Sequence, residues 1–321
     1  MKFEGSFRNE PLVIRGERVE LGEEKLIKVE IDRLPTGTVI EIPIFVYNGL
    51  DEGPTILIQA GLHGDEINGV ETVRALLRAN KLQIKRGCVI VVPLLNIFGF
   101  LHFSRDAHGK DVNRSFPGSK GGSLASRTAY FQMKEIVTHI DFGIDMHTGG
   151  AQRNNYPQIR YTPGSAAGKH LADIFNAPFQ FSSNLIAKSF RKEADKIGVP
   201  IIIYEAGEAL RIDKLAVQIG INGVMNILEY FAMIDPRPNP PKRLQTVVLT
   251  KKKWIRAKTA GMLELLVENG QAVKKGELLG YITDTYGAST LPVKAPSDGY
   301  IIAVNYFPIV SIGEAIFHFG Y

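Results

Sequence analysis

The amino-acid sequence predicts an α/β domain with a mostly parallel or mixed sheet, followed by a second domain made only of β-strands. From Thr55 onward, short and almost continuously apolar runs alternate with amphipathic helical stretches, which is typical of strands buried on both faces of a sheet. Residues 234–244 then contain four prolines in eleven positions, which can neither continue a helix nor lie mid-sheet, so they predict a linker. Beyond it, residues 246–321 again show only short strand-like runs and turns.

The elements of the first domain follow in chain order. Residues 18–31 and 38–49 alternate apolar and polar side chains, so residues 1–50 are expected to be mainly β-strands. Continuously apolar runs predict four further strands, at 55–60, 88–95, 142–146 and 199–206. A helix is expected at 67–80, because one helical stripe collects Ile67, Val70, Val73, Leu76 and Leu77. In the second domain, residues 268–282 and 294–305 have the texture of strands joined by turns.

Composition and charge narrow the class of protein. The chain has 321 residues, of which 45% are hydrophobic and 22% charged, as in an ordinary soluble globular protein. A net charge of +5 and a single basic block at 251–253, expected on a solvated loop or strand edge, do not indicate a nucleic-acid partner. The only cysteine, Cys88, excludes an internal disulfide and a cysteine-rich zinc site. Without an apolar leader or membrane span, a cytoplasmic protein with no membrane partner is expected; a homo-oligomer is left open.

A candidate metal site lies at the ends of the apolar strands. The spacing His-x-x-carboxylate means little by itself, and it occurs three times, in the pairs His63/Glu66, His108/Asp111 and His170/Asp173. Only the first pair directly follows a strongly apolar strand, and ligand sites of open α/β sheets form outside the carboxyl ends of strands. His147 follows a second apolar strand and precedes a glycine turn. A catalytic zinc needs three nitrogen or oxygen ligands and one open position, which His63, Glu66 and His147 would supply.

Simpler interpretations of these residues remain open at this point. The role of Glu66 could be limited to placing a negative charge at the N-terminus of the following helix, where carboxylates are favourable. His147 could be an ordinary turn histidine. Glu205 ends another apolar strand, where a carboxylate is costly unless it is partnered or functional, although it could also cap a helix. A glycine- and proline-rich loop further collects Arg105, Asp111, Asn113 and Arg114. Arginines recognise carboxylates in a bidentate manner, so this loop suggests an acidic substrate, unless it is only a solvated surface loop.

Four motifs taken together, GLHGDE, DVNRSFPG, DMHTGG and YEAG in this order, resemble the succinylglutamate desuccinylase/aspartoacylase family of the wider zinc carboxypeptidase-like group. The resemblance covers roughly residues 55–206. It implies an α/β/α sandwich with a central mixed sheet and one catalytic Zn²⁺ per chain. It also implies a zinc-dependent catalytic domain at 1–240 and a β-domain at 245–321, similar to a biotinyl/lipoyl-type barrel-sandwich hybrid.

The resemblance implies a role for each matching residue. His63, Glu66 and His147 match the metal ligands, and Glu205 matches the general base and acid. Arg105 matches the arginine that polarises the scissile carbonyl, and Asp111 matches the carboxylate that orients the first histidine. The residues that match substrate-carboxylate binders are Asn113, Arg114 and, by a weaker match, Arg191. Some relatives also place a tyrosine near the substrate, for which Tyr161 and Tyr204 are candidates without an assignment.

The C-terminal segment departs from a true carrier domain, which presents a modifiable lysine at a hairpin tip. Here the tip reads TYGASTL and has no lysine, while Lys294 belongs to the following strand. A structural or gating role over the site entrance is therefore expected.

The implied activity is hydrolysis of an amide that joins an acyl group to an amine, with a small N-acylated amino acid or similar carboxylate-bearing molecule as substrate. A metallocarboxypeptidase that removes C-terminal residues from peptides is the nearest alternative, and the appended β-domain favours the more restricted site of a deacylase. A catalytically inactive zinc-binding scaffold is the second alternative. It would have no need to retain Glu205, Arg105 and Arg114 together.

Overall fold

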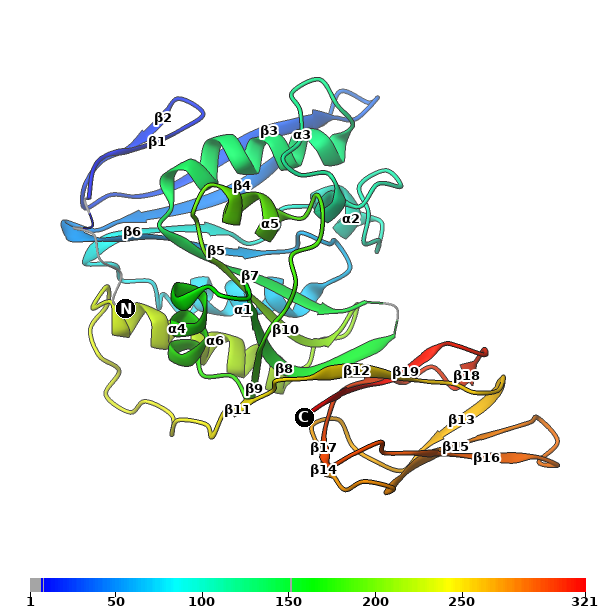
Figure 1. Ribbon diagram of the computed structural model, residues 1–321. Helices are drawn as coiled ribbons and strands as arrows, with labels where there is room; N and C mark the ends of the chain where they lie inside the picture. Colours follow the sequence, from blue (N-terminus) through cyan, green and yellow to red (C-terminus); the bar gives the residue numbers. More distant parts are fainter. Residues whose placement is uncertain (1–6, 8, 151) are drawn as a thin grey trace.

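The computed structural model describes residues 7, 9–150 and 152–321 (Figure 1). Its helices are α1 (Ile67–Arg78), α2 (Ile97–Leu101), α3 (Leu124–Phe131), α4 (Ala166–Phe175), α5 (Phe190–Lys196) and α6 (Lys214–Tyr230), with short 3₁₀ turns η1 (Val112–Arg114) and η3 (Val137–His139) and a π-helical turn η2 (Gln132–Ile136). The strands up to residue 208 are β1 (Leu12–Ile14), β2 (Glu17–Val19), β3 (Glu24–Arg33), β4 (Val39–Asn48), β5 (Asp51–Ala60), β6 (Arg86–Val92), β7 (Phe142–Gly149), β8 (Arg153–Tyr161), β9 (Phe179–Ser182) and β10 (Ile201–Glu208). The later strands are β11 (Val247–Val248), β12 (Lys252–Arg256), β13 (Gly261–Leu265), β14 (Ala272–Val273), β15 (Leu278–Thr283), β16 (Thr290–Lys294), β17 (Gly299–Asn305), β18 (Ile309–Val310) and β19 (Ala315–Gly320).

A large mixed sheet forms the centre of the molecule. Its main path runs β12-β19-β17-β8-β10-β7-β5-β6-β4-β3. The four strands β6, β5, β7 and β10 are parallel, whereas β3 with β4, β4 with β6 and β8 with β10 pair in the antiparallel sense. The mixed sheet and the α/β class that the sequence predicts are therefore confirmed. Because β5, β7 and β10 are parallel neighbours, their carboxyl ends meet at one edge of the sheet.

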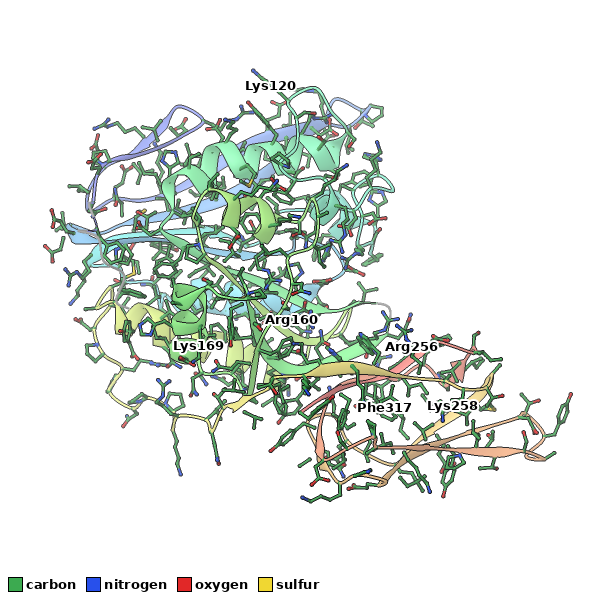
Figure 2. All side chains as sticks on the ribbon, in the orientation of Figure 1. Lys120, Arg160, Lys169, Arg256, Lys258 and Phe317 are labelled. Atoms are coloured by element: carbon green, nitrogen blue, oxygen red, sulfur yellow. The ribbon has the colours of Figure 1, made fainter. Side chains whose placement is uncertain are left out.

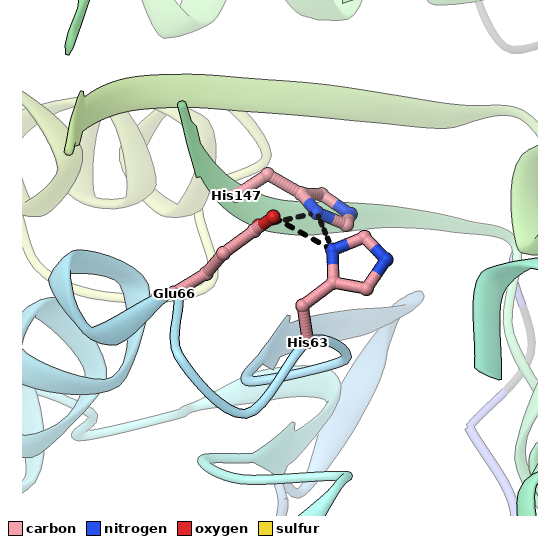
Figure 3. A group of neighbouring side chains, drawn as sticks. All are labelled: His63, Glu66 and His147. Atoms are coloured by element: carbon pink, nitrogen blue, oxygen red, sulfur yellow. Dashed lines mark hydrogen bonds and ion pairs between the residues drawn. The ribbon is translucent and has the colours of Figure 1, made fainter. Parts of the chain in front are cut away.

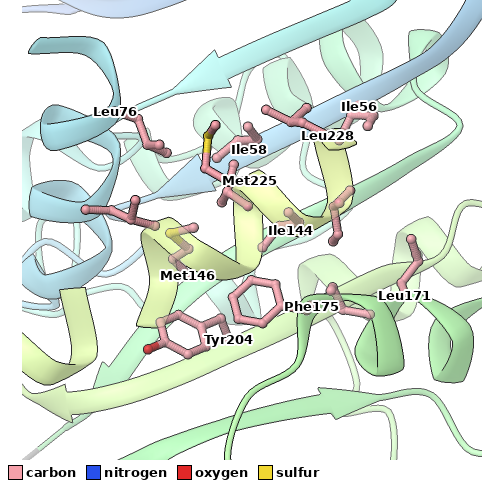
Figure 4. Packing of buried hydrophobic residues seen from close by; sticks show 14 of the residues in the cluster. Ile56, Ile58, Leu76, Ile144, Met146, Leu171, Phe175, Tyr204, Met225 and Leu228 are labelled. Atoms are coloured by element: carbon pink, nitrogen blue, oxygen red, sulfur yellow. The ribbon is translucent and has the colours of Figure 1, made fainter. Parts of the chain in front are cut away.

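Both faces of the sheet are buried under helices. Residues such as Ile56 and Ile58 of β5 face one core, which α1, α4 and α6 cover (Figure 4). Their neighbour Leu57 and residues of β6 such as Ile90 face a second core, which α3, α5 and the β1–β2 hairpin cover. Alternate residues of one strand thus enter different cores, which explains why these strands are apolar without a break.

The buried face of helix α1 overlaps the expected apolar stripe only in part. Val73 and Leu76 of that stripe are fully buried, as are the small residues Gly69 and Thr72 beside it, whereas the rest of the stripe is partly buried. A side chain at Gly69 would overlap Met146 of β7. The glycine therefore lets the helix lie close against the strand that carries His147.

The C-terminal strands join the central sheet directly. β17 pairs with β8, and β19 and β12 extend the sheet beyond it, while β13, β15, β16 and β18 form a separate four-stranded sheet. A core that includes Leu279, Ile301 and Phe317 lies between the two sets of strands. Residues 231–246, which include the predicted linker, contain no helix or strand. The domain boundaries and the likeness to a barrel-sandwich hybrid stay predictions.

None of the described helices is both long enough and apolar enough to cross a membrane.

Close packing between α4 and α6 gives a test of this fold. Gly223 of α6 lies against the ring of Phe175, and a methyl group there would overlap the ring (Figure 4 shows Phe175 beside Tyr204). Gly223→Ala gains about 1 kcal/mol of helix propensity but overpacks a filled core at about 1–3 kcal/mol. We expect a net loss in the free energy of unfolding, measured by urea denaturation.

The exposed Gln218 of the same helix provides the control, since Gln218→Ala should change stability by less than about 0.5 kcal/mol. Combining Gly223→Ala with Phe175→Leu should remove most of the penalty of the alanine. An increase in stability for Gly223→Ala alone would contradict the packing described.

Candidate functional site

His63, Glu66 and His147 converge at the carboxyl ends of β5 and β7 (Figure 3). His63 Nδ1 lies 2.8 Å from Glu66 Oε1, and His147 Nδ1 lies 2.8 Å from Glu66 Oε2. The two Nδ1 atoms are 3.2 Å apart, and all three side chains are buried. The structure thus brings together the three residues that the sequence predicts as metal ligands.

The outer nitrogens of both histidines face carboxylates. His147 Nε2 lies 2.8 Å from Asp145 Oδ2, and His63 Nε2 lies 3.3 Å from Asp111 Oδ1. A carboxylate next to Nε2 favours a proton on that nitrogen, so Nδ1 is the nitrogen left to bind a metal ion once the ion displaces its proton. Both Nδ1 atoms and the carboxylate of Glu66 converge within one group whose ligand atoms lie within 4.8 Å of one another. Two imidazole nitrogens and one carboxylate oxygen match the ligand set of a catalytic zinc site.

The charges of this cluster depend strongly on one another. Burial alone would lower the pKa of His147, but Asp145 and Glu66 outweigh burial and raise that pKa well above its ordinary value. Burial would likewise raise the pKa of Glu66, but His63 and His147 hold it well below its ordinary value. In the absence of a cation the histidines therefore retain protons, which a bound metal ion would have to displace.

Asp111 connects the metal group to the arginine loop. Arg105 donates from Nε to Asp111 Oδ2 and from Nη1 to Glu66 Oε1, each at 3.1 Å. The backbone N–H of Asn113 donates to Asp111 Oδ1 at 2.7 Å. Burial would raise the pKa of Asp111, but His63 and then Arg105 lower it far below its ordinary value. Asp111 is thus held as a carboxylate that contacts His63, Arg105 and η1 together.

The predicted substrate-binding residues line a single cavity beside the metal group. The cavity has a volume of about 670 Å³ and is lined by Asn113, Arg114 and Arg191 among others. Arg114 has an exposed guanidinium, whereas Asn113 Oδ1 accepts a hydrogen bond from the backbone N–H of Phe190. Arg191 is buried and donates from Nη2 to the carbonyls of Ser183 and Asn184. Burial, followed by the nearby Arg160, lowers its pKa to about 10.

Glu205 lies in the wall of the same cavity, at a point where β10 is irregular. Each of its two carboxylate oxygens contacts a different side chain. Arg160 Nη1 lies 2.9 Å from Oε1, and Asn155 Nδ2 donates to Oε2 at 2.7 Å. Figure 2 labels Arg160 near the middle of the molecule. The pairing of β10 with β7 also sets Glu205 opposite His147.

The sequence interpretation missed several residues of the site. One signal for Asp145 was available, because residues two apart on a strand point to the same face and Asp145 precedes His147 by two. Asn155 and Arg160 follow no apolar run, so no sequence signal indicates that they belong to the site. Trp254 also lines the cavity, although it belongs to β12, far along the chain. Its ring stacks on His318 with the centroids 4.5 Å apart, and the guanidinium of Arg153 lies 5.6 Å from its centroid.

Four other candidates from the sequence lie outside the described cavity lining. Tyr204 is buried in the core, where its hydroxyl donates to the carbonyl of Ala216 at 2.6 Å, and Tyr161 packs against the same core. The ring of His108 packs on Phe98, and His170 Nε2 lies 2.9 Å from the hydroxyl of Tyr230. Neither tyrosine therefore lines the cavity beside the metal group.

Comparisons with known sequences show what this chain is similar to. Residues 52–231 match the model of the succinylglutamate desuccinylase/aspartoacylase catalytic domain. Over 311 residues the chain is 26% identical to an N-alpha-acetyl-L-2,4-diaminobutyric acid deacetylase of Halomonas elongata, covering 90% of this chain and 88% of the relative.

Solved structures show the same fold. A succinylglutamate desuccinylase/aspartoacylase of Rhodobacter sphaeroides is similar with a TM-score of 0.80 at 24% identity, covering 93% of this chain and 95% of the other. The product-bound ectoine utilization protein EutE (DoeB) of Ruegeria pomeroyi has a TM-score of 0.82 at 21% identity, covering 98% and 99%. The family model spans more than half of the chain, and we conclude that this protein belongs to the succinylglutamate desuccinylase/aspartoacylase family.

Proposed function

We propose that this protein is a zinc-dependent amide hydrolase that removes the acyl group from a small N-acylated amino acid. Members of its family are deacylating hydrolases that act on amide bonds. The observation that carries the proposal is the presence of His63, Glu66, His147 and Glu205 around one cavity. The first three would hold one Zn²⁺ through His63 Nδ1, the Glu66 carboxylate and His147 Nδ1.

Each protein group has a separate task in the proposed reaction. A zinc ion held in this site would act as a Lewis acid and would make hydroxide available near neutral pH. A carboxylate oxygen of Glu205 takes the proton from the attacking water and delivers it to the nitrogen of the leaving amine. Arg105, which lines the cavity beside Glu66, stabilises the negative charge that develops on the carbonyl oxygen. Asn113 and Arg114 hold the substrate carboxylate in position.

The cavity favours a deacylase over a peptidase. Its volume of about 670 Å³ suits a small molecule, and Trp254 of the C-terminal strands forms part of its wall. A peptidase groove would need room for a chain on one side of the scissile bond, and a wall contributed by the C-terminal strands favours the smaller substrate. An inactive scaffold would not need Arg160 and Asn155 to hold both oxygens of Glu205.

The charges around the cavity support an acidic substrate. Five arginines line it, Arg105, Arg114, Arg153, Arg160 and Arg191, against the three carboxylates of Asp65, Glu66 and Glu205. Within the described part of the chain, only Arg105 and Arg160 of these five form ion pairs. A substrate with a single carboxylate would leave part of the positive charge of these arginines uncompensated. We therefore propose a substrate with a second anionic group, in contrast to the diaminobutyrate derivative named for the Halomonas relative.

Glu205→Gln tests the proposed proton transfer. The amide keeps the shape of the carboxylate but cannot accept the proton, so kcat should fall by about 10²–10⁴ in an assay of amine release. Zinc content should stay that of the unsubstituted protein, because Glu205 is not one of the three proposed ligands.

Glu208→Gln in the same strand is the matched control and should retain activity, since Glu208 does not line the cavity. Full activity of Glu205→Gln would remove Glu205 from the mechanism.

Zinc affinity should rise with pH. The pKa of His147 and that of His63 are both raised in the metal-free cluster, so each histidine keeps its proton above its ordinary titration range and competes with the metal. Zinc affinity should change by about tenfold per pH unit for each displaced proton between about pH 6 and 8. Competition with a chromophoric chelator of known pH dependence measures this slope.

The same titration on His102→Asn, which removes an exposed histidine outside the site, should give an unchanged slope. A pH-independent affinity would contradict the proposed ligands.

A charge series of substrates tests the proposed acidic preference. We expect kcat/KM to fall from N-acetyl-L-glutamate through N-acetyl-L-glutamine to N-acetyl-L-2,4-diaminobutyrate, by at least about tenfold overall, the factor for roughly 1.4 kcal/mol. Arg153→Gln should narrow this range, and Arg256→Gln on the exposed surface of β12 should leave it unchanged. The opposite order would show that the cavity selects a cationic side chain.

A further inference from the structure

A line of buried hydrogen bonds leads away from the metal group into the core. Asp145 Oδ2 lies 2.8 Å from His147 Nε2, and its other oxygen, Oδ1, accepts a hydrogen bond from Gln59 Nε2 at 3.0 Å. Gln132 Nε2 in turn donates to Gln59 Oε1. Gln59, Gln132 and Asp145 have no exposed surface, so no solvent replaces a bond that is lost.

Each bond in this line fixes the orientation of the next group. Because Gln132 donates to the carbonyl oxygen of Gln59, the amide nitrogen of Gln59 must face Asp145. A reversed Gln59 amide would bring its oxygen against the Asp145 carboxylate, which is repulsive. Asp145 is then an acceptor on both sides, so His147 keeps a proton on Nε2, and Nδ1, which faces Glu66 and His63, is the nitrogen left for a metal ion.

Gln132 occupies an unusual place in the fold. It begins η2, a π-helical turn that directly follows α3, and such turns are frequent at functional sites. Among the described residues, Gln132 Oε1 has no hydrogen-bond partner although it is buried. The donation from Nε2 to Gln59 Oε1 is therefore the side-chain hydrogen bond that the described structure gives Gln132.

We propose that Gln59 and Gln132 are positioning residues for the metal centre, which act through Asp145 to hold His147 in the tautomer and ring orientation that binds zinc. The inference rests on the proposed zinc site, and it extends that site to residues of β5 and η2 that contact neither metal nor substrate.

Gln59→Met tests the proposal because methionine has nearly the shape of glutamine but cannot donate to Asp145. The zinc dissociation constant of the full-length protein should rise about tenfold, the lower end of the range for residues that support metal ligands. The visible spectrum of the Co²⁺-substituted protein should also change. A purely structural role would lower the melting temperature and leave that spectrum unaltered.

Gln180→Met is the matched control. Gln180 is also buried and also donates to an aspartate, Asp173, at 2.7 Å, and its Oε1 also lacks a partner in the described chain. It belongs to β9 and lies outside the cavity lining, so its replacement should leave the zinc affinity and the Co²⁺ spectrum unchanged.

Gln132→Met tests whether Gln132 acts on His147 through Gln59, and it remains informative if Gln59→Met fails to fold. It should weaken zinc binding by less than Gln59→Met does. The double variant should be no weaker than Gln59→Met alone, because Gln132 acts only through Gln59.

Two results would overturn the proposal. If both methionine variants bind zinc as tightly as Gln180→Met, the glutamines do not position His147, and the proposed zinc site itself still stands. If the unsubstituted protein binds no zinc, the metal site and the positioning role both fail.

Discussion

The parallel pairing of β5, β7 and β10 is the constraint on which the site depends. Hydrogen bonds between these strands set Ala60 opposite Met146 and Glu205 opposite His147. A shift of one residue in either register would turn the functional side chains to the other face of the sheet and exchange them with core residues. The two cores that cover the sheet therefore fix the register as well as the stability. The site inherits its geometry from packing that lies mostly outside it.

The same sheet edge brings several charged groups together in the interior, where a charge is stable only beside a group of opposite charge. His63, Glu66, His147 and Asp145 are all buried, and each contacts a group of opposite or complementary charge. Removing one member leaves a buried charge without its partner, which is far more costly than losing a surface ion pair. The cluster is therefore a cooperative unit, and substitutions within it affect folding and chemistry together.

The sequence predicts the parts of this structure that depend on local patterns. Continuous apolar runs mark the central strands, and the polar residues at their ends mark His63, His147 and Glu205. Other parts depend on contacts between segments distant in the sequence. Gln59 and Gln132 meet across 73 positions, and Arg160 reaches Glu205 only because β8 pairs with β10. The buried face of α1 extends beyond the expected stripe because Gly69 allows a close approach that hydrophobicity alone does not predict.

The C-terminal strands also place an aromatic side chain in the cavity wall, a position that no sequence pattern predicts. Trp254 lines the cavity and is the only tryptophan of the chain. The indole emission of the whole protein therefore arises from the wall of the proposed active site. Because a bound ligand changes the surroundings of that ring, the intrinsic fluorescence of the unlabelled protein is a built-in reporter of cavity occupancy.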